Sequence, residues 1–331
     1  MRATHLETGA ITRVPSRNGY GEGLVEAGRR DERVVALAAD LTESTRTLPF
    51  AEAYPKRFIQ MGVAEQNMAS VAAGMAAMGK IPFIASYAMF SPGRNWEQIR
   101  TTIAYNNSNV KIIGAHAGVS VGPDGATHQA IEDIALMRLL PNMIVIAPCD
   151  VHEARKATLL AAKYDGPVYI RIGRSDTPVV TTVESPFIIG QAELFYEKNT
   201  THPTSVGIIT TGTLAFEALE AAKTIEAAGM GASVLHMATI KPLDTAALDS
   251  FIAAHDSLIT IEEHQVAGGL GGAVAEYVTL TNPKRIVRLG VQDQFGQSAS
   301  AVSNMPLKKS SAAIWRELVC TVAPRPSTAA G

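Results

Sequence analysis

Short apolar runs alternate with helix-like segments along the first half of the chain, and this alternation strongly restricts its fold. Strands joined by helices run parallel and are buried on both faces, and such a sheet binds ligands at the carboxyl ends of its strands. The helix at residues 66–78 is rich in Ala and Met and is expected to be buried. The predicted strands are residues 34–38, 58–61, 81–86, 110–115, 143–147 and 167–172, and the predicted helices are residues 66–78, 96–105, 130–140 and 151–163.

The alternation stops and then resumes. Residues 177–204 are rich in Pro, Thr and Ser and have no helical period. We therefore predict an α/β protein of two domains, residues 1–190 and 191–331, each with a mostly parallel sheet flanked by helices. The Pro/Ser/Ala-rich tail after Val322 is expected to be frayed. The second series has strands predicted at 205–210, 232–236, 257–262 and 285–289 and helices at 214–228, 245–254 and 270–279.

Net charge and cysteine content limit the partners and the cellular compartment expected for the protein. A formal net charge of −2 argues against nucleic acid and anionic membranes as partners. The two cysteines, Cys149 and Cys320, lie far apart and indicate a reduced, cytoplasmic protein rather than a disulfide framework. Residues 1–15 lack the apolar core of a secretory signal, and Lys80 and Pro82 interrupt the most apolar stretch, so we expect no membrane span.

Two glycine-rich segments resemble phosphate-binding motifs without matching them. Residues 74–80 (GMAAMGK) lead from a helix into a strand, the reverse of a P-loop, and are better explained as a tight turn. Residues 268–272 (GGLGG) open a helix, where amides could bind an anion, but close helix–strand packing is the preferred interpretation. Residues 262–264 (EEH) could ligate a metal, yet a polar strand end at a domain interface fits better.

Three loops at predicted strand ends carry the residues best suited to chemistry. Glu65 begins an apolar helix, which suggests a partly buried carboxylate able to exchange protons. Tyr87 and Phe90 follow the next strand. The Gly-rich segment 116–129 (HAGVSVGPDGATHQ) combines two histidines with an aspartate between a strand and a helix.

These loops, read as MGVAEQNM at 61–68, SYAMFSPGR at 86–94 and HAGVSVGPDGATHQ at 116–129, together resemble the pyrimidine-binding part of transketolase. The similarity runs from about residue 17 to 174, and the second series resembles the C-terminal domain of that family. The chain is therefore similar to the separate C-terminal subunit of split transketolases. This implies a thiamine diphosphate-binding fold followed by a transketolase C-terminal-like domain.

The resemblance assigns cofactor and substrate roles to individual residues. It implies that Glu65 is catalytic and protonates a ring nitrogen of thiamine diphosphate, beside Phe90 as the stacking partner. Departures from the family pattern flank Glu65 and fall at Pro92–Gly93, and they leave the sugar substrate open. Arg171 is a weaker candidate for the phosphate clamp. The other implied residues are Tyr87 and Asp40 near the cofactor, Asp124 and catalytic His128 at the sugar hydroxyls, and His116, Arg17, Ser44 and Arg174 as the sugar-phosphate clamp.

One family motif is missing from the chain. Transketolases hold the diphosphate and its Mg²⁺ or Ca²⁺ through Gly-Asp-Gly, and this sequence contains no such triplet. The resemblance therefore implies no metal site here, a cofactor shared across a subunit interface, and an N-terminal partner chain that binds the metal. By analogy we expect a heterotetramer with two copies of each chain.

The function implied is transfer of a two-carbon ketol unit between sugar phosphates, in the pentose phosphate pathway, as one subunit of a two-chain transferase of aldehyde or ketone groups. Two alternatives remain open at this stage. One is another thiamine diphosphate enzyme, either the beta chain of a 2-oxoacid dehydrogenase or a deoxyxylulose-phosphate synthase-like enzyme. The other is a non-catalytic partner module, against which the presence of Glu65, Asp124 and His128 argues.

Overall fold

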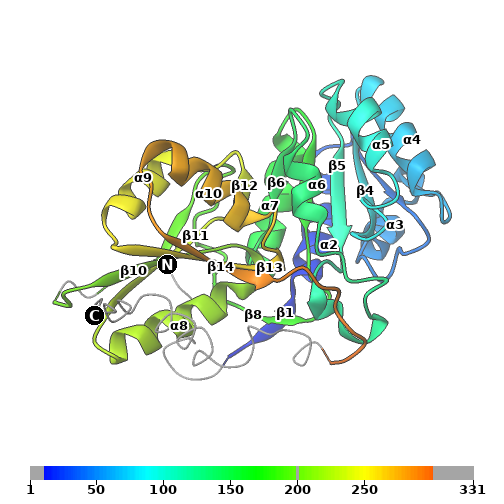
Figure 1. Cartoon of the computed structure of the whole chain (residues 1–331). Helices are drawn as coiled ribbons and strands as arrows, with labels where there is room; N and C mark the ends of the chain where they lie inside the picture. Colours follow the sequence, from blue (N-terminus) through cyan, green and yellow to red (C-terminus); the bar gives the residue numbers. More distant parts are fainter. Residues whose placement is uncertain (1–10, 199–200, 301–331) are drawn as a thin grey trace.

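A computed structural model describes residues 11–198 and 201–300. The chain forms two main sheets that lie side by side, each flanked by helices, which confirms the predicted α/β fold class (Figure 1). A short antiparallel ribbon, β1 (Arg13–Pro15) with β8 (Asp176–Pro178), lies beneath them. The predicted tail after Val322 lies outside the described residues.

The first sheet has seven strands in the order β12-β6-β7-β5-β4-β2-β3. All neighbours are parallel except β12, which runs antiparallel to β6 and comes from the second half of the chain. The sequence did not indicate this exchange, because β12 has only three residues. The strands are β2 (Val34–Ala38), β3 (Phe58–Gln60), β4 (Ile81–Tyr87), β5 (Lys111–Ala115), β6 (Ile144–Ile146), β7 (Val168–Arg171) and β12 (Thr239–Lys241).

Helices cover both faces of this sheet, which explains why its strands read as continuous apolar runs. Val35 and Leu37 face one core and Val34 and Ala36 the other, as alternation along a strand requires. One face is covered by α4 (Glu65–Ala77), α5 (Trp96–Gln98) with the π-helical turn Ile99–Ala104, and α6 (Asp133–Arg138). The other face is covered by α2 (Ser16–Arg30), α3 (Leu48–Ala53) and α7 (Val151–Lys163).

Helix α4 departs from the prediction of a buried helix. Gln66, Asn67, Ser70, Gly74 and Ala77 are exposed and recur at helical spacing, so one side of α4 faces outward. The opposite side, with Met68, Ala69 and Ala72, packs in the core. The small, weakly polar side chains on the outer stripe gave the segment its apolar composition without burial.

The second sheet has five strands in the order β14-β13-β10-β11-β9, and only β9 is antiparallel to its neighbour. The predicted boundary at residue 190 falls in the connection between β8 and β9, and we keep it as a proposal. The elements are β9 (Glu193–Tyr196), β10 (Ser205–Thr210), β11 (Gly231–His236), β13 (Ser257–Gln265) and β14 (Ile286–Val291), with α8 (Ala215–Ala227), α9 (Thr245–Ala253) and α10 (Leu270–Thr281).

The two glycine-rich segments take the roles preferred from sequence. Residues 74–80 connect α4 to β4 through Gly79, whose φ of 82° suits glycine. At the start of α10 the amides of Leu270 and Gly271 donate to the Glu262 carboxylate at 2.7 and 2.8 Å. The anion at this helix N-terminus is therefore the protein's own side chain, and burial raises the pKa of Glu262 to about 7.

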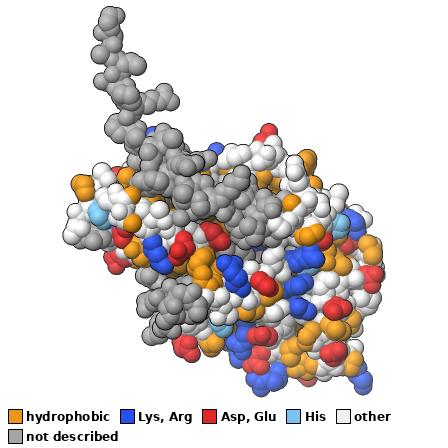
Figure 2. All heavy atoms as spheres, turned by 90° about the horizontal axis from the view of Figure 1, so that it is seen from below, with side chains coloured by type: hydrophobic (Ala, Val, Ile, Leu, Met, Phe, Trp, Pro, Cys, Tyr) orange, Lys and Arg blue, Asp and Glu red, His pale blue; other side chains and the backbone are white. Residues whose placement is uncertain are grey.

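No helix of the described ranges is both long and apolar enough to cross a membrane. On the face shown in Figure 2, Lys and Arg side chains are interspersed with Asp and Glu, as the near-zero net charge predicts.

Candidate active site

The predicted site residues gather along the carboxyl edge of the first sheet. Asp40 and Ser44 follow β2, Glu65 follows β3, and Tyr87 ends β4. His116 follows β5 directly. Neighbouring parallel strands end at the same edge, so residues far apart in sequence come together there. Asp40 and His116 have positive φ values of 58° and 53°, a conformation that non-glycine residues adopt mainly in turns and functional sites.

Glu65 is a buried carboxylate with both oxygens engaged. Its side chain is 1% exposed although it is the first residue of α4. Oε1 accepts a hydrogen bond from Ser86 Oγ at 3.0 Å, and Oε2 accepts one from Arg94 Nη1 at 2.6 Å. The helix N-terminus adds favourable positive potential. This accounts for a buried negative charge in a helix that has no other charged residue.

The loop after β4 brings an aromatic ring and a cation to Glu65. A side chain at Gly93 would place Cβ only 1.9 Å from the Met89 carbonyl oxygen, so the tight turn requires glycine there. The turn places the Arg94 guanidinium carbon 4.8 Å from the centroid of the Phe90 ring. Arg94 was not among the residues predicted for the site, because only the folded loop shows that it reaches Glu65.

Two aromatic residues and two histidines form a continuous cluster beside this loop. The Tyr87 ring stacks on His116 with centroids 4.0 Å apart. His128 lies edge-on to Phe90 at 5.5 Å and to Tyr87 at 6.3 Å. The hydroxyl of Thr127 lies 2.9 Å from His128 Nδ1 and restrains that ring. The structure thus joins the predicted cofactor residues to the predicted substrate residues.

Arg17 and His116 form a polar pair with unused donors. Arg17 Nη1 donates to His116 Nε2 at 3.0 Å and to the main-chain carbonyl of Ser44 at 2.9 Å. Burial and the nearby Arg17 charge lower the pKa of His116 to about 3, so the ring is neutral. His116 Nε2 also lies 3.2 Å from the Ser44 carbonyl oxygen. In the tautomer with its proton on Nδ1, Nε2 accepts from Arg17, which can only donate. His116 Nδ1 and Arg17 Nε are buried and have no hydrogen-bond partner within the described part of the chain.

Positive charge is concentrated around this pair. Burial, and then the neighbouring Arg46 and Arg174, lower the pKa of Arg17. Arg174 Nη1 donates to Asp124 Oδ1 at 2.9 Å and to the Val121 carbonyl at 3.0 Å, which ties the Gly-rich loop to the end of β7. Clustered guanidinium groups with free donors suit a phosphate.

Asp40 stands apart from the other predicted residues. It is exposed, and its backbone N–H donates to Gln60 Oε1 at 2.8 Å. Across residues 11–198 and 201–300 its side chain shares no hydrogen bond with the rest of the site. The main-chain carbonyl of Ser44 accepts from Arg17, and the role of Ser44 in the sugar-phosphate clamp stays a prediction.

Comparison with known proteins shows the family of the chain. The family described as transketolase, pyrimidine binding domain, matches residues 13–179, and the transketolase C-terminal domain matches residues 200–307. A putative transketolase C-terminal section from Methanocaldococcus jannaschii is 44% identical over 86% of this chain and 89% of its own length. The chain belongs to the transketolase family.

Further matches place it with the split members of that family. A 6-deoxy-6-sulfo-D-fructose transketolase subunit of Clostridium sp. is 38% identical over 85% of this chain and 86% of its own length. A solved split-gene transketolase, described as an inactive β4 tetramer, aligns with a TM-score of 0.84 and 42% identity over 93% of this chain and 99% of that one. This chain is therefore a transketolase-family subunit of the C-terminal type.

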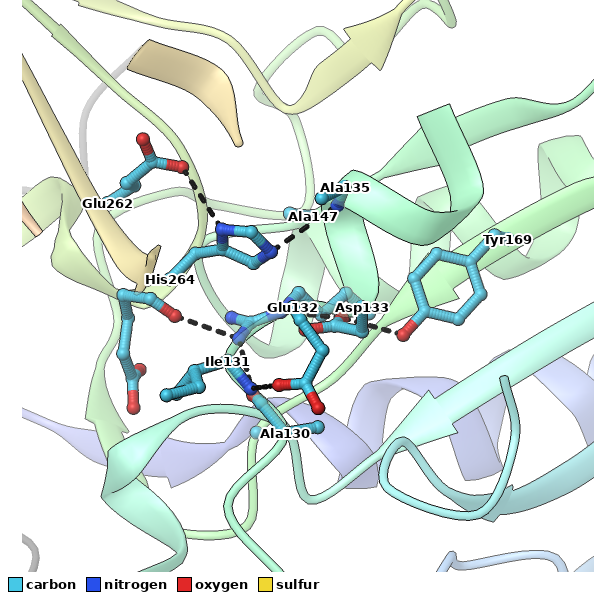
Figure 3. A network of polar contacts seen from close by, with 12 residues as sticks. Ala130, Ile131, Glu132, Asp133, Ala135, Ala147, Tyr169, Glu262 and His264 are labelled. Atoms are coloured by element: carbon cyan, nitrogen blue, oxygen red, sulfur yellow. Dashed lines mark hydrogen bonds and ion pairs between the residues drawn. The ribbon is translucent and has the colours of Figure 1, made fainter. Parts of the chain in front are cut away.

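Arg171, the weaker clamp candidate, is buried inside this transketolase subunit rather than in the site. Figure 3 shows two of its neighbours, Asp133 and Tyr169, pointing toward one another. Arg171 is 7% exposed, and its Nε donates to Asp133 Oδ2 at 2.9 Å. The Tyr169 hydroxyl donates to the same oxygen at 2.7 Å. Arg171 Nη2 donates to the Glu263 carbonyl at 2.8 Å, so Arg171 links the first sheet to β13.

Glu263 supports the site from the second sheet of the transketolase fold. Oε1 accepts from the Ser120 amide at 2.6 Å and Oε2 from the Thr213 hydroxyl at 2.9 Å. The Gly118 position allows this, because a Cβ there would lie 2.3 Å from Glu263 Oε1. The preferred interpretation of residues 262–264 as a polar strand end between the two halves agrees with these contacts, but the support for the His116 loop was not foreseen.

A second polar cluster joins the two halves of the transketolase chain. Cys149, Glu153 and His236 place potential ligand atoms within 4.8 Å of one another, although their spacing in sequence gives no metal motif. His236 Nε2 lies 3.0 Å from Glu153 Oε2, and the Cys149 amide donates to the same oxygen at 2.8 Å. Burial acts to lower the pKa of His236, but the Glu153 carboxylate raises it, which favours the charged pair. His236 Nδ1 is buried and has no hydrogen-bond partner among the described residues.

Proposed function

We propose that this chain, with an N-terminal partner that carries the diphosphate and metal site, transfers a two-carbon ketol unit between sugar phosphates. The observation that carries the proposal is the buried Glu65 carboxylate beside the Phe90 ring, on the same strand edge as the Arg17–His116 pair. Cytoplasmic location and the pentose phosphate pathway belong to the same proposal.

The residues fit thiamine diphosphate on the side of its aminopyrimidine. Glu65 offers a carboxylate that can hold or move a proton at a ring nitrogen, and Phe90 offers a ring face for stacking. When bound, the cofactor supplies the carbon nucleophile that attacks a ketose carbonyl. Tyr87 and Asp40 would line the same pocket.

The substrate would lie over the neighbouring loops. His116 Nδ1 and Arg17 Nε are free to donate to a phosphate, with Arg174 and the Ser44 segment beside them. His128 and Asp124 would bind the sugar hydroxyls near the reacting carbons, and His128 would act there as a catalytic residue. The neutral state of His116 lets it donate through Nδ1 while it accepts from Arg17.

The partner is proposed to complete the site. The chain has no Gly-Asp-Gly, so the diphosphate and its Mg²⁺ or Ca²⁺ would be bound mainly by the partner. Two copies of each chain would form a heterotetramer with two shared cofactor sites. The exposed stripe of α4 next to Glu65 is available for such an interface.

The test is reconstitution with a candidate N-terminal partner chain that contains Gly-Asp-Gly. Xylulose 5-phosphate and ribose 5-phosphate are supplied with thiamine diphosphate and Mg²⁺, and ketol transfer is expected only in the mixture. Glu65→Gln should lower kcat by about 100-fold or more, the usual scale for a lost proton-transfer group. Activity of this chain alone, or full activity of the variant mixture, contradicts the proposal. Turnover of a 2-oxoacid donor instead would identify a different enzyme of the same cofactor class.

A further inference from the structure

The Glu65 carboxylate is closed off by a side chain that reaches the surface. Both of its oxygens have partners, and the side chain itself is 1% exposed. Ser86 is fully buried, whereas the Arg94 side chain is 42% exposed. Of the two partners, Arg94 is therefore the one that can leave without disturbing the core. A ligand atom that approaches Glu65 Oε2 from the surface meets Arg94 Nη1 there, 2.6 Å from that oxygen.

The same guanidinium also covers the Phe90 ring. Its central carbon lies 4.8 Å from the ring centroid, within the range of a cation–π contact. A guanidinium is flat and delocalised, and its N–C–N unit both stacks on aromatic rings and donates to carboxylates. Arg94 thus makes, with one planar group, the two contacts that an aminopyrimidine would make with Glu65 and Phe90.

The backbone of the loop holds Arg94 at this position. The Arg94 amide donates to the Phe90 carbonyl at 3.0 Å, and the Gly93 amide donates to the Ala88 carbonyl at 3.3 Å. Asn95 Nδ2 donates to the Glu65 main-chain carbonyl at 3.1 Å, which fixes the end of the loop on the start of α4. The backbone of Arg94 is therefore anchored by its neighbours on both sides, while its side chain lies against Glu65 and Phe90 and is exposed on its outer side, from which it can leave.

We propose that the Arg94 guanidinium is a placeholder for the aminopyrimidine ring, which keeps Glu65 and Phe90 covered in the free subunit and leaves both when the ring enters. The inference rests on the proposed function for the identity of the ring. It explains why a buried carboxylate stays compensated before the partner and cofactor arrive, since an unpaired buried charge is costly. Binding of the ring then competes with an internal ion pair.

The competition can be measured on the isolated chain with 4-amino-5-hydroxymethyl-2-methylpyrimidine as the probe. Calorimetric titration of Arg94→Ala should give a dissociation constant roughly fivefold lower than that of the unaltered chain, as expected when a half-exposed ion pair no longer competes. Arg94→Lys keeps the charge without the planar group and should bind with intermediate affinity. Arg33→Ala is the matched control, because it removes an exposed arginine from an ion pair with Asp31 at the amino end of β2.

A second measurement follows Arg94 directly. The side chain of Arg94 lies over the Phe90 ring, which shifts its proton NMR resonances. In the unaltered chain, saturating probe should move these chemical shifts toward those of a solvent-exposed arginine. Equal or weaker probe binding by Arg94→Ala, or unmoved resonances at saturation, overturns the placeholder role. The placeholder role is also overturned if Arg94→Ala raises the affinity for the probe equally in a Glu65→Gln background, since Arg94 would then not act through Glu65. If neither the unaltered chain nor Arg94→Ala binds the probe, the inference fails, whereas the proposed function is decided separately by the activity of the two-chain mixture.

Discussion

Arg171 and Arg174 lie three residues apart, and we predict different effects when each is replaced by methionine. The substitution at Arg171 should lower stability, and the substitution at Arg174 should weaken substrate binding. Methionine keeps much of the apolar stem of arginine and removes the charge. Arg171→Met leaves Asp133, which is 1% exposed, without its cation. Breaking a buried ion pair by removing one partner costs about 3–5 kcal/mol. The hydrogen bond from Arg171 Nη2 to the Glu263 carbonyl is lost as well.

Arg174→Met removes a pair whose side chains are 36% and 30% exposed, so its cost to stability should stay below about 1 kcal/mol. Urea unfolding followed by circular dichroism gives both values on the isolated chain. In the reconstituted enzyme, Arg174→Met should raise KM for sugar phosphates, and Arg171→Met should leave KM unchanged at a temperature where the variant is folded.

The outcome that refutes this reasoning is a similar stability loss in both variants, or a cost below about 1 kcal/mol for Arg171→Met. A second substitution sharpens the test. If the loss arises from the orphaned carboxylate, adding Asp133→Asn to Arg171→Met should recover part of the unfolding free energy, because a neutral amide is less costly to bury than a charge. No recovery would indicate that packing around Arg171, and not the charge of Asp133, sets the cost.

Three further predictions use glycine packing and histidine titration. Gly19→Ala should lower the unfolding free energy by about 1–3 kcal/mol, because its Cβ would lie 1.9 Å from the Val151 carbonyl oxygen. The Cβ of Gly74→Ala meets no atom within 4 Å, so this variant should raise the unfolding free energy by about 0.5–1 kcal/mol. Urea unfolding measures both values. Burial acts to lower the pKa of His236 but Glu153 raises it, so the stability from this pair is present below pH 6.5 and is lost as pH rises through the folded-state pKa. The destabilisation by His236→Gln should therefore shrink as pH rises above 6.5. The pKa of His116 is lowered from 6.5 to about 3, so the unfolded chain binds a proton that the folded chain refuses, and His116→Gln should lose less stability than the unaltered chain as pH falls across that range.

Segments with strong local patterns were predicted from sequence with little error. The helix at 151–163 and the strands at 34–38 and 205–210 have the bounds that the structure shows. Helix α2 was not predicted, because its four glycines weaken the helical pattern. Two of them, Gly19 and Gly23, are required by packing, since α2 lies so close to α7 that neither has room for a side chain. Propensity and close packing here favour opposite residues, and packing decides.

The helix predicted at 130–140 forms only over Asp133–Arg138, and contacts distant in sequence explain the difference. Ala130 and Ile131 offer their carbonyls to Arg171 and to the Gln265 amide instead of continuing a helix. The same holds for Arg94 and Glu263, whose roles depend on a folded turn and on a residue 143 positions away from its partner Ser120. No local pattern carries such information.

The split between Arg171 and Arg174 follows from where the strand ends. Within β7, Tyr169 and Arg171 are two residues apart and share a face, so both point at Asp133. Arg174 lies beyond the last paired residue, where the chain is free to turn toward the sheet edge. His116, directly after β5, obeys the same rule. A residue inside the ladder is committed to one covered face, whereas a residue just past it can reach a ligand shared by several strands. Strand ends therefore separate structural charges from candidate ligand-binding charges, even between neighbours with the same side chain.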